Sequence, residues 1–252
     1  MTGRTYLINV GANASHRFAG PIFSDGTFEF LPISEDRDLP AGDGVRYHNL
    51  RSFYDLGQDL MRYVPPRLRD RTAHADPEWD TFTYGDNCAT SPRAAALKRV
   101  VPGDRLLFLV RLQSWDQIGL TEAYGFYLVG FIHVDGMLRN VTARPDDAVL
   151  DRFGRNSHVW RGLSGPGLWN GFCAFSGSSQ SRRLSRAAPL DRSLANRFLP
   201  SADGSPWRWD AGGSDLQVIG SYTRSYHCVI DPALPGHSER SDILWEWVMR
   251  HE

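Results

Sequence analysis

The sequence predicts an α+β fold built on a mostly antiparallel or mixed β-sheet with a few flanking helices. Two apolar runs, 105–112 and 125–134, are short, rich in Leu, Val, Ile and Phe, and bounded by Gly, Pro and Asp, as buried strands are. Predicted strands outnumber predicted helices and come in hairpin-like groups. A PUA-like, partly closed barrel is an alternative form of the same sheet. We expect the whole chain, 1–252, to form a single domain.

The N-terminal part is predicted to hold a strand, a hairpin and a helix. The first strand spans residues 6–10. Asp25-Gly26 lies between two apolar runs and predicts a hairpin, because type I′ turns need φ > 0. Residues 50–63 show apolar side chains near helical spacing, and the Pro-Pro pair that follows would end this helix.

The central and C-terminal parts complete the predicted sheet. A Ser-Pro pair predicts the start of a short helix over 91–100. Residues 113–124 are predicted to be an aromatic, polar loop between the two buried strands, which suits a ligand. Residues 135–157 have the composition of a polar connection, and 168–175 that of another strand. A serine is expected to cap a final amphipathic helix over 241–248.

Charge and composition exclude several classes of protein. The formal net charge of −1 gives no global field that attracts nucleic acid or an anionic membrane. No apolar run approaches the ~20 residues of a membrane helix. The three cysteines, Cys88, Cys173 and Cys228, are too few and too far apart for a disulfide framework, and they form no CxxC pair. We therefore expect a cytoplasmic protein with no membrane partner and no cofactor.

The first candidate site is the segment 83–87, with Tyr84 and Asp86. No GxSxG, HExxH or P-loop motif is present, and no GxGxxG precedes a helix, so candidates must come from such short segments. Asp86 could act as a general base or accept a hydrogen bond from a base or sugar. The alternative is an ordinary loop in which Asp86 bonds nearby backbone N–H groups.

The second candidate is the segment 156–161. If it is a strand, alternation places Asn156, His158 and Trp160 on one side. Asn156 and His158 could then read the edge of a base, while Trp160 stacks on its ring. The alternative is a partly exposed strand whose histidine is structural.

The third candidate is a phosphate-binding segment rich in serine and arginine. Ser181, Arg182 and Arg183 follow a Gly-Ser stretch, whose backbone amides and guanidinium groups together suit phosphate. Arg161 is assigned to the same role. The alternative for the cluster is a solvated basic helix face.

The fourth candidate is aromatic, a stacking platform or base cage. The alternative is that these rings cover the edge of the core. The residues concerned are Trp115, Tyr124, Trp169, Trp207 and Trp209. The spacing of His133, His158 and His227 relative to aspartates supports no metal site, so none is predicted.

Short motifs in a fixed order resemble a known family. They are Gly-Pro-Ile at 20–22, Phe-Leu-Pro-Ile-Ser-Glu at 30–35, His-Ala-Asp-Pro-Glu at 74–78, Thr-Tyr-Gly-Asp at 83–86, Pro-Gly-Asp at 102–104, Asn-Ser-His at 156–158 and Ser-Arg-Arg-Leu at 181–184. This order is similar to that of the third nucleotide modification-associated domain family, found with systems that hypermodify DNA bases. Residues 81–134 also resemble PUA-like domains, such as the ASCH, EVE and YTH domains, which implies a pocket for RNA or a modified base.

Three interpretations follow from the residues and the resemblance. The first is a binding module for a modified or flipped base, in which Arg182 and Arg183 hold the backbone. The second is an enzyme of nucleotide or DNA base hypermodification that uses Asp86 or His158 as acid/base. The third is an interaction subunit of a bacterial defence, phage-related or modification system. We favour the first because the chain offers aromatics and arginines but no paired carboxylates. Expected partners are DNA or a nucleotide, and modification or restriction enzymes of the same operon.

Overall fold

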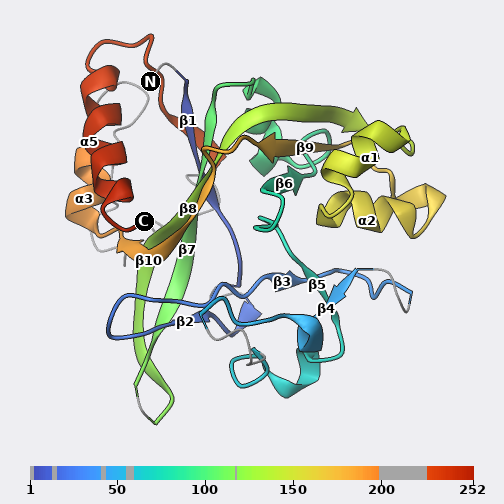
Figure 1. Cartoon of the computed structure of the whole chain (residues 1–252), viewed down its shortest axis with the longest axis horizontal. Coiled ribbons are helices and arrows are strands. Elements are labelled where there is room, and N and C mark those ends of the chain that lie inside the picture. Colours follow the sequence, from blue (N-terminus) through green and yellow to red (C-terminus); the bar gives the residue numbers. More distant parts are fainter. Residues whose placement is uncertain (1–2, 13–15, 41–43, 55–59, 117, 199–225) are drawn as a thin grey trace.

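The structure, a computed structural model, describes residues 3–12, 16–40, 44–54, 60–116, 118–198 and 226–252 (Figure 1). None of the helices in these ranges is long and apolar enough to cross a membrane. The strands are β1 (Thr5–Asn9), β2 (Gly20–Ile22), β3 (Ile33–Ser34), β4 (Val45–Arg46), β5 (Thr72–His74), β6 (Thr83–Asp86), β7 (Arg105–Trp115), β8 (Leu120–Val141), β9 (Phe172–Gly177), β10 (Arg182–Pro189) and β11 (Tyr226–Ile230).

The main sheet is mixed, as the sequence predicts. Its strand order is β11-β1-β7-β8-β9-β6, with β10 also paired to β8 and β2 to β7. Both β1 and β2 run parallel to β7, and the other pairs are antiparallel. The described strands form no closed barrel, so the resemblance to PUA-like domains stays a prediction.

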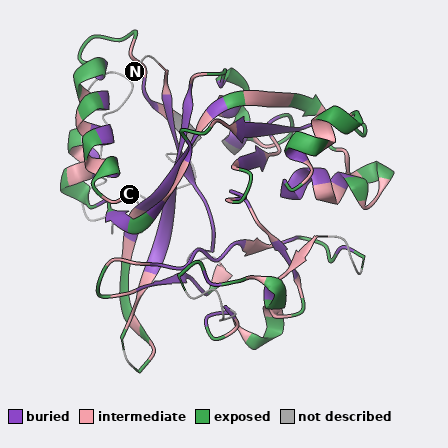
Figure 2. Ribbon diagram, viewed as in Figure 1, coloured by how far each residue is buried: buried purple, intermediate pink, exposed green. Residues whose placement is uncertain are grey.

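Strand β7 is the centre of the sheet, and its two faces are buried in two different clusters. Leu106, Phe108 and Val110 pack on one face, while Leu107 and Leu109 pack on the other. A strand covered on both faces has a continuous apolar sequence, which is why this run was recognisable as a buried strand. Figure 2 shows this part of the sheet as largely buried.

The predicted ligand loop over 113–124 is wrong. Strands β7 and β8 pair as far as Trp115 and Leu120, so the hairpin continues and only a tight turn connects them. Asp116 closes this turn by accepting hydrogen bonds from the N–H groups of Ile118 and Gly119, at 2.8 Å each. The first part of the predicted polar connection over 135–157 is also strand, because β8 passes through an irregularity after Val134 and runs on to pair with β9.

The described parts of the predicted helix over 50–63 are not helical. The hydroxyl of Ser52 and the N–H of Phe53 both donate to the carboxylate of Glu29, and residues 53 and 54 form a bend. The predicted helix over 91–100 is a 3-10 helix, and the Ser91 side chain makes no capping hydrogen bond. The final helix begins at His237 after Gly236, whereas Ser241 is buried within it and is not its cap.

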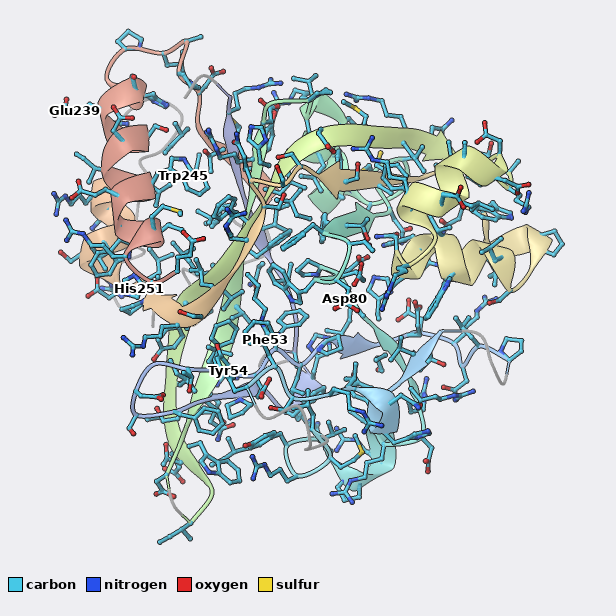
Figure 3. All side chains as sticks on the ribbon, in the orientation of Figure 1. Phe53, Tyr54, Asp80, Glu239, Trp245 and His251 are labelled. Atoms are coloured by element: carbon cyan, nitrogen blue, oxygen red, sulfur yellow. The ribbon has the colours of Figure 1, made fainter. Side chains whose placement is uncertain are left out.

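Helices cover the main sheet in two places. They are α1 (Asp147–Phe153), α2 (Ser157–Leu163), α3 (Arg192–Phe198) and α5 (His237–Met249), with 3-10 turns at Tyr47–Asn49, Pro66–Leu68, Pro92–Arg99 and Pro166–Leu168. Trp245 lies on the side of α5 that faces the sheet, with its ring centroid 4.7 Å from that of Phe131 (Figure 3). Helices α1 and α2 pack through Phe153 and Val159 on the apolar side of β9.

A small second sheet, of order β3-β5-β4, lies beneath β6 and α2 (Figure 1). Its middle strand ends at His74, and the chain then passes through Asp76 and a cis bond to Pro77. Polar residues at this strand end therefore lie next to the main sheet and to the start of α2. This junction is where the candidate site forms.

The burial of β7 can be tested by removing one of its aromatic rings. Phe108→Ala is expected to lower the free energy of unfolding by about 3–5 kcal/mol, because it removes a fully buried ring from the core. Ile118→Ala, at a side chain that is 97% exposed, should change it by less than about 0.5 kcal/mol. Urea unfolding followed by circular dichroism measures both. Equal stability of the two variants would contradict the central placement of β7.

Candidate functional site

Residues from the N-terminal half of the chain and from helix α2 meet at one polar pocket of about 290 Å³. They include residues at the end of β5, in strand β6, in the first turns of α2 and in a stretch after β3. This first pocket is lined in part by Glu35, His74, Asp76, Tyr84, Gly85, Asp86, Asn87, His158 and Arg161. Four of the sequence candidates, Tyr84, Asp86, His158 and Arg161, therefore share a single cavity.

His74 lies between two carboxylates. Its Nδ1 is 2.7 Å from Oε1 of Glu35, and its Nε2 is 3.2 Å from Oδ2 of Asp76. Burial disfavours the charged imidazolium, but the hydrogen bonds and charges of Asp76 and Glu35 outweigh it and raise the pKa of His74 to about 10. At neutral pH His74 is therefore a cation held by two anions.

Asp76 connects His74 to helix α2. Its Oδ1 accepts a hydrogen bond from the side-chain amide of Asn156 at 3.0 Å, and its Oδ2 is 3.4 Å from Nε2 of His158. Burial raises the pKa of Asp76 to about 6, against the opposing hydrogen bond and charge of His74. The carboxyl group is thus mostly ionised at neutral pH.

His158 is neutral, and its surroundings determine which ring nitrogen carries the proton. Burial, and then the positive charges of His74 and Arg161, hold the pKa of His158 well below its ordinary value. Arg161, one helical turn later, donates from Nη2 to Nδ1 of His158 at 2.8 Å. Because arginine can only donate, Nδ1 is the acceptor and Nε2 carries the hydrogen that faces Asp76.

Strand β6 forms the opposite wall of the first pocket. The Tyr84 hydroxyl donates to Oδ2 of Asp86 at 3.1 Å, and the N–H of Asn87 donates to Oδ1 at 2.6 Å. These bonds fix the carboxylate of Asp86 in place. The local bonding expected of an ordinary loop is therefore present, but Asp86 also lines the pocket.

Gly85 permits the close approach of β6 and α2. A Cβ at this position would lie 2.6 Å from Cδ2 of His158 and 2.9 Å from Oδ1 of Asn156, closer than ordinary contacts allow. Both neighbours are buried and held by hydrogen bonds. The absence of a side chain at residue 85 is thus needed to bring the two walls together.

The segment 156–161 is not the strand that the alternation of its side chains suggested. Asn156 is the N-cap of α2 and accepts a hydrogen bond from the N–H of His158 at 3.1 Å. On a helix, residues 158 and 161 share one side and residue 160 points elsewhere. His158 and Arg161 therefore line the first pocket, while Trp160 does not.

Trp160 lines a second pocket of about 380 Å³. This second pocket is lined in part by Glu29, Trp79, Arg155, Ser157, Trp160 and Arg183. It combines indole rings with guanidinium groups, which is the character that the sequence analysis expected of a base-binding site. It shares no lining residue with the first pocket.

The residues predicted to bind phosphate do not form one site in the structure. Arg183 is largely buried, with Nη2 3.6 Å from Oε2 of Glu29, and its guanidinium carbon is 3.8 Å from the ring centroid of Phe53. Phe53 and Tyr54 lie next to one another near the middle of the molecule, with ring centroids 5.1 Å apart (Figure 3). Burial lowers the pKa of Arg183, opposed by the charges of Tyr54 and Glu29.

The neighbours of Arg183 point to the surface or to the backbone. Arg182 pairs with Glu252, Nε to Oε1, at 2.6 Å. Ser181 is buried, and its hydroxyl oxygen accepts from the N–H of His133 at 3.1 Å. Arg182 and Arg183 begin strand β10 and are not on a helix face. Because successive side chains of a strand point to opposite faces of the sheet, those of Arg182 and Arg183 lie apart. Arg161, by contrast, lies in the first pocket.

The remaining aromatic candidates have structural partners. Trp115 packs edge-on against Tyr63 with ring centroids 4.9 Å apart, and Trp169 stacks on Phe172 at 6.0 Å. Tyr124 lies under the guanidinium of Arg111 at 3.5 Å. These three rings line neither the first nor the second pocket. Trp207 and Trp209 lie outside the described residues.

Glu35, His74 and Asp76 were not predicted from the sequence to belong to a site. The only available signal was the motif His-Ala-Asp-Pro-Glu, which contributed to the family resemblance. In the structure, one ligand atom each from His74, Asp76 and His158 lies within 4.8 Å of the others, so this group could hold a metal ion. His133, which was considered from the sequence with His158, is not in this group, and the side chain of His227 lies outside the described part of the structure.

The chain matches the family described as nucleotide modification associated domain 3 over residues 4–215, and it belongs to this family. This confirms the resemblance drawn from the motifs, and it associates the protein with nucleotide modification. No curated protein and no solved structure matches the chain.

The tight contact at residue 85 generates the second prediction. Gly85→Ala is expected to destabilise the fold by about 1–3 kcal/mol, because the added methyl group must displace His158 or Asn156 from a packed, hydrogen-bonded position. Gly167→Ala is the matched control, since nothing lies within 4 Å of its added Cβ. Chemical unfolding measures both variants. A stable Gly85→Ala protein would contradict the close approach of β6 and α2.

Proposed function

We propose that this member of the nucleotide modification associated domain 3 family is an enzyme that acts on the base of a nucleotide or of DNA, with the first pocket as its active site. The observation that carries the proposal is the convergence of Asp86, His158 and Arg161 on one cavity from segments more than seventy residues apart along the chain. Membership of the family supports nucleotide modification as the broader role.

The size and lining of the first pocket fit a base better than a longer stretch of nucleic acid. Its volume of about 290 Å³ is at the lower end of small-molecule sites, which begin near 300 Å³. Carboxylate groups can accept hydrogen bonds from the amino group of a base, and Arg161 can donate to a carbonyl or phosphate oxygen. A base of a DNA strand would have to be flipped out to enter it.

Asp86 is the group best placed to serve as general base. Its carboxylate is held by Tyr84 and by the N–H of Asn87 and still lines the pocket. Both ring nitrogens of His158 are already directed at protein groups, Nδ1 at Arg161 and Nε2 at Asp76. His158 therefore belongs to the supporting wall, and the acid/base role falls to Asp86.

A second function, recognition of a base without chemistry, is supported by the second pocket. Trp79 and Trp160 offer faces on which a base can stack, and Arg155, more than half exposed and paired with Asp80 at 2.5 Å, offers a cation that a phosphate could bind in competition with that carboxylate. In this alternative the protein is a reader in the cytoplasm that works beside modification or restriction enzymes of the same operon. Absence of nucleotide binding at either pocket would favour an interaction subunit instead.

The enzyme proposal predicts the effect of removing the base. Asp86→Asn should lower turnover by about 10²- to 10⁴-fold, because the amide cannot accept a proton, while binding changes little. The assay incubates the full chain with nucleotide pools and with unmodified DNA, and detects altered nucleosides by mass spectrometry. Asp70→Asn is the control, because the Asp70 side chain is 98% exposed and pairs with the surface residue His48. Full activity of Asp86→Asn would remove Asp86 from the chemistry.

The alternative proposal predicts the effect of removing the stacking ring. Trp160→Ala should weaken binding of an oligonucleotide with a modified base by about 1–3 kcal/mol. Fluorescence anisotropy at two salt concentrations measures it, and Tyr124→Ala, an exposed aromatic outside both pockets, is the control. Unchanged affinity in Trp160→Ala would argue against a base in the second pocket.

A further inference from the structure

We propose that His74, Asp76 and His158 form a binding site for one divalent transition-metal ion in the wall of the first pocket. The ligand atoms of the three side chains lie within 4.8 Å of one another. Oδ2 of Asp76 is 3.2 Å from Nε2 of His74 and 3.4 Å from Nε2 of His158. Two imidazole nitrogens and one carboxylate oxygen beside an open cavity are the donor set of mononuclear Fe(II) and catalytic Zn(II) sites.

The surroundings of the three ligands are those of a built site. Glu35 lies 2.7 Å from Nδ1 of His74 and would keep that nitrogen protonated, so the ion would bind at Nε2 and release the second proton of the His74 imidazolium to the solvent. Metal-binding histidines commonly donate their second N–H to a carboxylate in this way. Asn156 donates to Oδ1 of Asp76 at 3.0 Å, so the other oxygen, Oδ2, is the one that remains for the ion.

The chemistry of the donors restricts the ion. Mg²⁺ and Ca²⁺ prefer oxygen ligands and water, whereas imidazole suits Fe, Co, Ni, Cu and Zn. The histidine and aspartate ligands are at most one-seventh exposed, so an ion there would be reached only from the pocket. When bound, it would supply a Lewis acid or an activated water opposite Asp86.

Arg161 contacts one of the proposed ligands, His158. Its guanidinium group occupies Nδ1 of His158 at 2.8 Å and also donates to Oδ1 of Asn87 at 3.2 Å. Coordination through Nε2 moves the ring hydrogen of His158 to Nδ1, so Arg161 must give up this contact and keep the one to Asn87. A neighbouring positive charge also repels the incoming ion. Arg161 is therefore expected to weaken metal binding.

Cobalt is a suitable probe because its visible absorption reports the ligands. The full chain, freed of metal by a chelator and dialysis, is titrated with Co²⁺ by calorimetry and absorption. We expect one equivalent of Co²⁺, with visible bands and without the charge-transfer band of a thiolate, which would indicate Cys88 or Cys173 instead. Absence of saturable binding in the wild-type protein would overturn the inference.

Variants locate the ion. His74→Gln, Asp76→Asn and His158→Gln should each lower the affinity for Co²⁺ by at least about 100-fold, and Glu35→Gln by about 10- to 100-fold. His48→Gln, at a half-exposed histidine outside the cluster, should bind as the wild type does, and Arg161→Gln at least as tightly. Circular dichroism shows which variants fold, and Glu35→Gln and Arg161→Gln keep the test decisive if the ligand variants do not. Equal affinity in all folded variants would place the ion elsewhere.

The inference goes beyond the proposed function, because Co²⁺ binding is measured without substrate. Absence of Co²⁺ binding would not decide whether Asp86 is the general base, because the Asp86→Asn assay compares two proteins under the same metal conditions. Loss of Asp86 as general base would leave the cobalt titration unaffected.

Discussion

The mutual neutralisation of buried charges around His74 is the constraint on which the site depends. Burying a carboxylate costs several kcal/mol unless a cation and hydrogen bonds compensate. Glu35 and Asp76 are both almost fully buried, and His74 lies between them while Arg161 approaches Glu35 at 3.8 Å. Removing one member leaves its partners unpaired. The network therefore ties the small sheet to helix α2 more firmly than any single contact would.

The main sheet makes this junction possible. Strand β7 is packed on both faces, so the strands that pair outward from β8 have a rigid base. Strand β6 is the last strand of this series and brings Tyr84, Gly85 and Asp86 to its margin. Because Gly85 has no side chain, α2 can approach closely enough for His158 to contact Asp76. The polar side chains of the site thus lie at the edge of the sheet, and the core remains apolar.

Helix α2 divides the polar residues into two groups with different chemical character. One side carries His158 and Arg161 toward carboxylates and a second histidine, and the other carries Trp160 toward arginines and aromatic rings. The first arrangement suits proton transfer and metal chemistry, while the second suits stacking and anion binding. The two proposed functions, an enzyme and a reader, each rest on one of these two sides.

The sequence by itself determined the fold class, the central strands and the family. Continuous apolar runs bounded by turn residues identify strands buried on both faces, because their signal is local and periodic. The segment 156–161 was wrongly interpreted as a strand, because a short stretch of polar and aromatic residues fits strand alternation and a capped helix equally well. Only the tertiary structure decided which polar residues meet. Asn156 and Asp76 are 80 positions apart, and the close approach at Gly85 that joins them leaves no pattern in the chain.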